Sequence, residues 1–328
     1  MTTTLMDRVR WPLLMLAVVG ALLLAVALGT ISLAPGVVWD ALLGRGDPAA
    51  ITVVHVLRLP RAVLAGLIGT GLGIAGAALQ GTMRNPLAEP YLLGVSGGAA
   101  VGAVLAVSLG VTAVLLPIAA FGGAVLAVAV TFFVAHAAGT RGDARILLMA
   151  GVVVGAFANS VIMLVLGTAP SNAVRDAVWW MMGSVAAATW SQNVWLAVYL
   201  FIGGTALVAW SRQIDVLALG DDTAAALGLA PETTARRIYA AAALVAAATV
   251  AAAGLVGFVG LVVPHIVRGL GVRRHRPLLI GSALAGAALV ILADLAARTL
   301  RPPSELPLGA VTAIVGVPFF LARLRRLA

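Results

Sequence analysis

Long stretches without a charged side chain constrain the fold of this chain more than any other feature. A helix that crosses a lipid bilayer needs about 20 consecutive apolar residues, because the hydrocarbon core is about 30 Å thick and a helix rises about 1.5 Å per residue. Charged residues make up only 10% of the 328 residues, whereas soluble proteins contain roughly 25%. The sequence therefore predicts an all-α polytopic membrane protein, built as one transmembrane domain over residues 1–328.

The uncharged stretches also predict the individual helices. Residues 90–140 are too long for one span, and Pro117 is the expected break between two. Residues 238–267 predict either one helix or two short helices that turn near residues 254–257. The predicted spans, nine or ten in number, lie within residues 11–38, 62–83, 90–140, 146–174, 177–211, 238–267, 277–297 and 306–322.

The distribution of arginine decides between these two counts, because cytoplasmic segments of membrane proteins are enriched in basic residues. All 21 basic residues are arginine. With ten helices and a cytoplasmic N-terminus, 15 of the 21 lie on the cytoplasmic side. With nine helices, the clusters at 268–276 and 323–326 would both lie outside. We therefore expect about ten transmembrane helices with both termini in the cytoplasm.

One polar segment, residues 211–237, separates two apolar spans. Asp221 and Asp222 favour a helix N-terminus, Gly228 can end that helix, and Pro231 can open the next one. The polar segment therefore predicts short cytoplasmic helices between helices 6 and 7, where they would contact a partner. A solvated connector without a partner is the alternative.

Missing residue types exclude several activities. The chain has no cysteine, which excludes disulfides, thiolate nucleophiles and cysteine metal sites. It has no lysine, so it cannot contain the Gly-x-x-x-x-Gly-Lys-Ser/Thr loop that binds ATP. The four histidines are scattered and form no metal-binding motif. The net charge of +9 follows from cytoplasmic arginine and does not indicate a nucleic acid partner. We predict that this chain has no catalytic residue, metal site or cofactor.

Two local motifs are candidates for a functional role. Residues 84–90 combine two prolines with polar side chains at the predicted inner membrane edge, where irregular backbone is tolerated if it is covered or lines a cavity. They predict a gate, with an ordinary loop as the alternative. Asp294 is the one acid inside a predicted span, and an intramembrane carboxylate is a functional candidate. Because Arg298 lies one helical turn further on, a structural ion pair is the alternative.

Several motifs, taken in order, resemble the FecCD-type permeases, which are the membrane subunits of type II ABC importers for ferric siderophores, haem and cobalamin. The ordered set is far more specific than any one motif. The motifs are LRLPR at 57–61, RNPLAEP at 84–90, LGVSGGA at 93–99, WMMGS at 180–184, LGD at 219–221, FVGLVVPHIVR at 258–268, AD at 293–294 and ELPLG at 305–309.

The resemblance implies an assembly around this chain, which would be a transport subunit in the cytoplasmic membrane, in contact with lipid, and not an enzyme. The implied partners are a second permease subunit, identical or homologous, two ATPase subunits that hold ATP and magnesium, and an extracytoplasmic substrate-binding protein. The implied cargo is an iron chelate, with a ferric siderophore first and haem or cobalamin as the other candidates. The competing hypothesis is an ion-coupled secondary transporter with Asp294 as its intramembrane coupling residue.

The resemblance also implies roles for particular residues. In the family, the position of the polar segment forms coupling helices that contact the ATPase. The implied roles are ATPase coupling for Asp221, Asp222, Leu227 and Gly228, cytoplasmic gate and translocation path for Asn85, Pro86 and Leu87, and docking of the binding protein for Arg58, Arg61 and Arg298. The other half of the gate should lie near residues 141–145, where the match is weakest and no gate residue is assigned.

Overall fold

The computed structural model describes residues 5–138 and 144–324, and within these ranges the chain forms helices and no strand. Seven helical segments are long and apolar enough to cross a membrane, and three shorter apolar helices accompany them. The bundle helices are α1 (Leu5–Ala27), α4 (Leu59–Thr82), α5 (Val95–Ser108), α6 (Leu116–Ala137), α7 (Ala144–Thr168), α9 (Trp190–Ala209), α12 (Pro231–Ala253), α13 (Val259–Gly269), α14 (His275–Thr299) and α15 (Leu308–Leu324).

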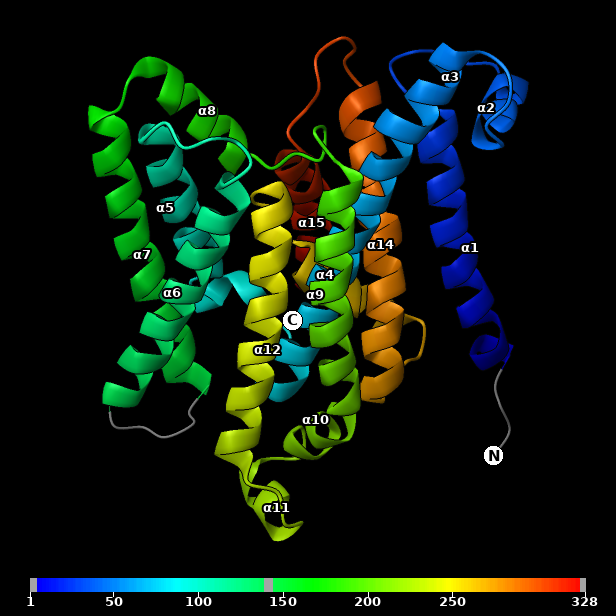
Figure 1. Cartoon of the computed structure of the whole chain (residues 1–328). Helices are drawn as coiled ribbons and strands as arrows, with labels where there is room; N and C mark the ends of the chain where they lie inside the picture. The colour runs from blue at the N-terminus through cyan, green and yellow to red at the C-terminus, as the bar shows by residue number, and fades with distance from the viewer. Residues whose placement is uncertain (1–4, 139–143, 325–328) are drawn as a thin grey trace.

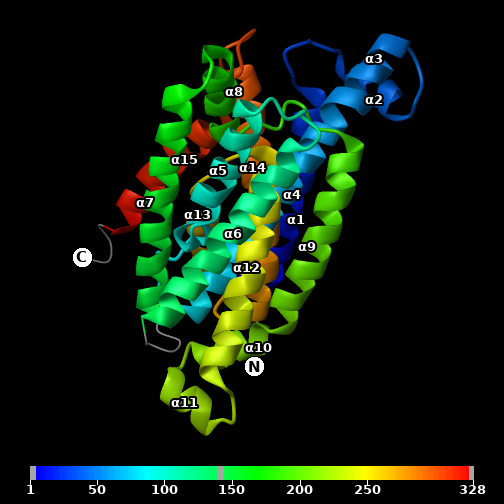
Figure 2. The ribbon, with the colours of Figure 1, turned by 60° about the vertical axis from the view of Figure 1, so that its left-hand side comes forward.

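The bundle helices run roughly alongside one another, and the short helices gather at its two ends (Figures 1 and 2). We call the end that carries α10 (Ser211–Leu217) and α11 (Asp221–Ala226) the inner end. The opposite, outer end carries α2 (Pro35–Leu42), α3 (Pro48–Thr52) and α8 (Ser171–Met181). Two further short elements are the π-helical turn η1 (Val53–Arg58) and the 3-10 turn η2 (Pro90–Leu93).

Helix α4 forms the centre of the bundle, since nearly all of its residues are buried. It packs against α14, α12, α13 and α9. Glycine permits this close packing: a Cβ atom on Gly69 would lie 2.0 Å from the Gly286 carbonyl oxygen of α14, and one on Gly76 would lie 2.0 Å from that of Gly260 in α13. Small residues allow such close approach in lipid, where packing replaces the hydrophobic driving force. The glycine pattern of α4 is therefore structural.

Two predicted breaks are confirmed. Pro117 lies in the first turn of α6, after the turn that follows α5. The second break separates α12 from α13 at Gly254, whose φ of 72° places it in the left-handed region that favours glycine. A Cβ atom there would also lie 2.1 Å from the Trp180 carbonyl oxygen. Residues 238–267 therefore form two helices.

One predicted span holds more than one element. The span predicted at 177–211 contains the end of α8, an irregular turn, and then α9, which starts at Trp190 and lies wholly within the predicted range. The Thr189 hydroxyl caps α9 by accepting a hydrogen bond from Gln192 N at 3.2 Å, a local signal that an uncharged stretch does not reveal. Residues 33–61 at the outer end are also largely helical, because α2 and α3 lie among them and α3 and η1 continue directly into α4.

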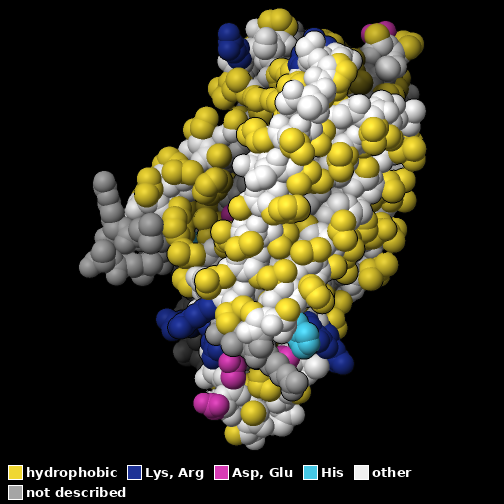
Figure 3. Space-filling view, turned by 90° about the vertical axis from the view of Figure 1, so that its left-hand side faces the viewer, with side chains coloured by type: hydrophobic (Ala, Val, Ile, Leu, Met, Phe, Trp, Pro, Cys, Tyr) yellow, Lys and Arg dark blue, Asp and Glu magenta, His cyan; other side chains and the backbone are white. Residues whose placement is uncertain are grey.

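The molecular surface has the charge distribution of a membrane protein. In Figure 3, hydrophobic side chains cover the broad middle of the visible face, while arginine and acidic side chains gather at the inner end around the polar segment. Many large exposed side chains on the bundle helices are apolar, including Phe133 on α6, Phe157 on α7 and Phe201 on α9. An aqueous surface would disfavour this arrangement, whereas lipid accommodates it.

Candidate functional site

Helix α11 is the part of the polar segment that extends furthest from the bundle (Figure 1). Asp221 and Asp222 occupy its first turn, and Gly228 follows its end with a φ of 78°. Ala224 is fully buried and fixes the helix to its neighbours. Leu227 is 63% exposed. The predicted coupling residues thus lie on an exposed helix that combines acidic and apolar side chains.

The predicted gate residues follow the inner end of α4. The chain leaves the helix at Arg84, whose φ of 52° is left-handed. The Asn85 side-chain oxygen then accepts a hydrogen bond from Leu87 N at 2.9 Å, which closes a tight turn. Pro86 and Leu87 are exposed at the surface. The sequence predicts the irregular backbone correctly, and the turn places this segment at the same end of the molecule as α11.

An ion pair joins these two predicted sites. Arg84 Nη2 lies 3.0 Å from Asp221 Oδ2, although 137 positions separate the two residues in the sequence. Both side chains are well exposed, so the pair contributes only about 0–1 kcal/mol to stability. Its importance is geometric, because it places the end of α4 beside the start of α11.

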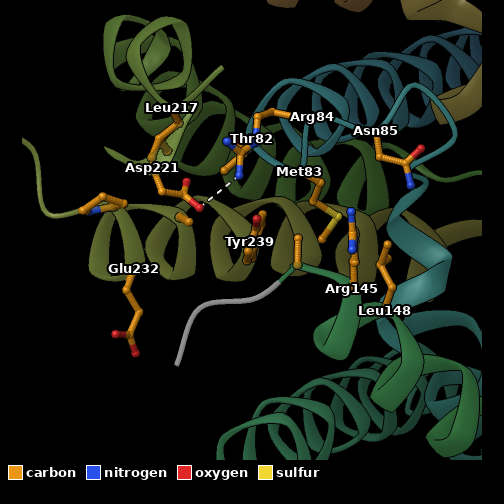
Figure 4. Close-up of a pocket in the computed structure, with 13 residues that line it drawn as sticks. Thr82, Met83, Arg84, Asn85, Arg145, Leu148, Leu217, Asp221, Glu232 and Tyr239 are labelled. Carbon is orange, nitrogen blue, oxygen red and sulfur yellow. Dashed lines mark hydrogen bonds and ion pairs between the residues drawn. The ribbon is translucent and has the colours of Figure 1, made fainter. Parts of the chain in front are cut away.

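A cavity of about 760 Å³ opens next to this ion pair (Figure 4). Its lining comes from the ends of α4 and α10, the starts of α7 and α12, and α11. Arg145 and Leu148 of α7 line the same cavity as Arg84 and Asn85. Of the region in which no gate residue was assigned, residues 141–143 lie outside the described residues, whereas Arg145 is placed directly on the cavity.

Glu89 and Tyr91 fasten the segment after the predicted gate to the break between α12 and α13. Glu89 Oε1 accepts a hydrogen bond from Phe258 N at 3.0 Å. The Tyr91 hydroxyl donates to Val256 O at 3.0 Å and accepts from Val256 N at 3.1 Å. Burial raises the pKa of the Glu89 carboxyl, and the hydrogen bond from Phe258 N opposes that shift. These partners are tertiary, so the motif around residue 89 predicts the loop but not its attachment.

The three predicted docking arginines lie at the outer end and are all buried. Arg58 Nη1 donates to the carbonyl oxygens of Val26 at 2.7 Å and Ala27 at 2.9 Å. Arg298 Nη2 donates to that of Ala25. These carbonyls belong to the last turn of α1, where a helix offers them no internal partner. Arg58 therefore fixes α1 to η1, and Arg298 fixes it to α14. Direct docking would require exposed arginines, whereas these two are buried.

Arg61 forms the centre of a buried ionic cluster. Its Nη2 atom lies 2.8 Å from Asp294 Oδ1, and its Nη1 atom lies 2.7 Å from Glu305 Oε1. Asp294 is 1% exposed and also lies 3.7 Å from Arg298 Nε. Of the two alternatives for Asp294, the structure supports an ion pair, and its main partner is Arg61. Sequence spacing indicates Arg298 but cannot indicate a partner 233 positions away.

Metal ligands do not gather in the part of the chain that the structure describes: no group of three or more His, Cys, Asp or Glu side chains could hold an ion there.

Comparison with known proteins connects this arrangement to one family. The family model named FecCD transport family matches residues 14–326, which is nearly the whole chain. The chain belongs to the FecCD transport family. This confirms the resemblance drawn from the ordered motifs. As a member, the chain is a multi-pass protein of the cytoplasmic membrane, in agreement with its seven apolar spans.

Curated relatives of this FecCD member are ABC transporter permeases. The uncharacterized permease YvrB of Bacillus subtilis is 38% identical over 283 residues, which are 85% of this chain and 80% of the relative. The cobalamin import system permease BtuC of Halobacterium salinarum is 38% identical over 299 residues, covering 88% and 80%. The vitamin B12 import system permease BtuC of Salmonella paratyphi A is 38% identical over 317 residues, covering 95% and 94%.

Solved structures share the fold. An ABC transporter assigned to the metal-chelate type, in an inward-facing conformation, aligns with a TM-score of 0.88 and 27% identity over 97% of this chain and 99% of that one. PsaBC from Streptococcus pneumoniae in complex with Fab aligns with a TM-score of 0.59 and 15% identity, over 83% and 92%, and this shows likeness of fold alone.

Proposed function

We propose that this chain is the transmembrane permease subunit of an ATP-driven importer, with ATP hydrolysis on a separate ATPase subunit. The observation that carries the proposal is the exposed helix α11 outside the bundle, with Asp221 and Asp222 in its first turn and the exposed Leu227 directly after its last residue. Family membership and the permease relatives support the same role. In this proposal the seven long spans and the three shorter apolar helices form ten crossings, with both termini and the inner end in the cytoplasm.

The surface of α11 supports contact with an ATPase. Leu219 and Leu227 are each 63% exposed, although they lie outside the apolar bundle. Fully burying a leucine side chain contributes roughly 1.5–3 kcal/mol, so a protein surface that covers both would gain considerable binding energy. The neighbouring Asp221 and Asp222 would fix the orientation through charged groups on the partner. We propose that these residues, with Gly228, form the coupling contact.

The exposed side of α7 supports a second permease subunit. Asn159 is exposed near the middle of this helix, and its amide makes no hydrogen bond within the described residues. An amide without partners in hydrocarbon costs several kcal/mol. We infer that this side of α7 faces a second permease or a hydrated path between two permeases. Asn85, Pro86 and Leu87 would border the cytoplasmic end of that path, beside the inner cavity.

Docking of a substrate-binding protein at the outer end remains a proposal that requires a rearrangement. Arg58, Arg61 and Arg298 would have to exchange partners within this chain for acidic groups of the binding protein. Arg61 is the best placed for such an exchange, because one of its partners, Glu305, has a side chain that is 37% exposed.

The proposed cargo is an organic metal chelate. Two relatives named above import cobalamin or vitamin B12, and one similar structure is assigned to the metal-chelate type. These similarities support cobalamin as the first substrate to test. A ferric siderophore, which the family resemblance placed ahead of cobalamin, is the second. The ion-coupled alternative receives less support, because the Asp294 carboxylate is already paired with two arginines of this chain.

The test is purification of the tagged chain from its native membrane in a mild detergent. We expect an ATPase subunit to co-purify, and ATP hydrolysis to rise when the binding protein is added. Reversal of charge at Asp221 and Asp222 should abolish ATPase recovery while the chain still inserts into the membrane. Recovery of the folded chain alone, without ATPase activity, would contradict the importer and favour the ion-coupled alternative.

A further inference from the structure

Ile214 and Asp215, two consecutive residues of α10, connect the polar segment to the bundle. Asp215 Oδ1 accepts a hydrogen bond from His275 N at 3.0 Å, and His275 Nδ1 lies 2.6 Å from the same oxygen. His275 is the first residue of α14, so its N–H is one of the first-turn donors that lack a partner inside the helix. Asp215 therefore caps α14 from another helix and also holds the imidazole ring of its first residue.

Gly81 of α4 lies against both connections. A Cβ atom on Gly81 would lie 2.3 Å from His275 Nε2 and 2.7 Å from Ile214 Cγ2. Ile214 is fully buried. Helix α4 thus has a notch at Gly81, which the Ile214 side chain and the His275 ring fill. We call Gly81, Ile214, Asp215 and His275 the α10 joint.

The joint lies on a packed route from α11 to the predicted gate. Helix α11 packs against α10 and α12, and α10 packs against α4 and α14. On α4, the Gly81 carbonyl oxygen accepts the hydrogen bond from Arg84 N at 3.3 Å, so the gate turn begins one helical turn after the notch. The Arg84–Asp221 pair also joins the end of α4 to the start of α11. Both side chains are exposed, however, so their attraction is too weak to move a helix.

We propose that the α10 joint transmits displacement of α11 to the inner end of α4, and that Asp215 and His275 are its positioning residues. The inference rests on the proposed function, because it assumes that an ATPase moves α11. The two hydrogen bonds fix α10 to the start of α14, and Ile214 in the Gly81 notch prevents α10 from sliding past α4. A packed core that cannot deform continuously passes such a displacement on as a rigid-body shift.

The test uses the complete complex, reconstituted in lipid vesicles with its ATPase, second permease and binding protein. Two quantities are measured: the rise in ATP hydrolysis on adding binding protein, and uptake of labelled cobalamin or of a siderophore carrying radioactive iron. For Asp215→Ala we expect normal ATPase recovery but stimulation reduced about tenfold or more, since hydrogen bonds to a charged group are lost. Asp215→Asn should restore most of the stimulation, because its amide oxygen can accept both bonds.

His275→Ala should reproduce the loss of stimulated ATP hydrolysis. His136→Ala is its matched control and should keep wild-type stimulation, since His136 is an exposed histidine in the last turn of α6 at the inner end. Wild-type stimulation in both folded Asp215→Ala and His275→Ala complexes would overturn the joint, as would loss of ATPase binding in them. If these variants do not fold, Ile214→Leu, which removes the Cγ2 methyl group that faces Gly81 and keeps the side-chain volume, is measured instead, and wild-type stimulation overturns the joint. Failure of the wild-type complex to recruit an ATPase would instead refute the proposed function.

Discussion

Removing the Arg61 guanidinium should destabilise the outer end of the bundle strongly. Arg61→Met keeps much of the side-chain length but leaves Asp294, which is 1% exposed, with only Arg298 Nε at 3.7 Å as a charged partner. Removing one partner of a buried ion pair costs about 3–5 kcal/mol, because the remaining charge stays buried without compensation. We expect a loss of that size in the free energy of unfolding.

The matched control is Glu305→Gln, because Glu305 contacts the same guanidinium but its side chain is 37% exposed. Water can replace that contact, so the expected loss is about 0–1 kcal/mol. The double variant Arg61→Met with Asp294→Asn removes both buried charges. Its loss should therefore be smaller than the sum of the two single losses.

The assay is unfolding of the purified chain in mild-detergent micelles by added dodecyl sulfate, followed by the fluorescence of its seven tryptophans. A loss for Arg61→Met no larger than that for Glu305→Gln would refute the reasoning, as would strict additivity in the double variant. The same proteins also address the ion-coupled alternative. A folded Asp294→Asn variant with normal ATP-driven uptake confirms a structural carboxylate, whereas folded protein without uptake supports a coupling role.

Three further predictions concern packing and the inner end. Gly76→Leu should abolish accumulation of folded protein, because its Cβ atom would lie 2.0 Å from the Gly260 carbonyl oxygen; Gly257→Ala, with no atom within 4 Å of the added Cβ, should express normally. Leu227→Ser should leave the unfolding curve unchanged, since the side chain is 63% exposed. It should weaken ATPase co-purification by roughly 5–30-fold, the equivalent of 1–2 kcal/mol of binding free energy. Recovery of as much ATPase as with the wild-type chain would contradict the coupling contact. Gly228→Ala should lower the free energy of unfolding by about 1 kcal/mol, because Gly228 has a φ of 78° and a side chain there strains the left-handed backbone. An unchanged free energy of unfolding would show that the turn relaxes.

The positions of most helices could be predicted from the sequence, for a physical reason. In lipid each backbone group must find its partner within its own helix, so a span is a local property of an uncharged stretch. The break at Pro117 and the short helix that begins at Asp221 follow from local backbone preferences, the break at Gly254 follows from the arginine distribution, and all three are confirmed. Hydropathy places α9 within residues 177–211 but does not mark its first residue, because the Thr189 cap lies inside an uncharged stretch.

The candidate sites were predictable only as separate pieces. Ordered motifs indicated the family, the gate segment and the polar segment, since each is a short run of residues. Contacts between the pieces depend on how helices pack, and these include Arg61 with Asp294, Arg84 with Asp221 and His275 with Asp215. Their partners lie between 60 and 233 positions apart, and no local pattern encodes such a pairing. The sequence by itself therefore determined the helices and the family, whereas only the tertiary structure decided which charges are buried together and which helix ends meet.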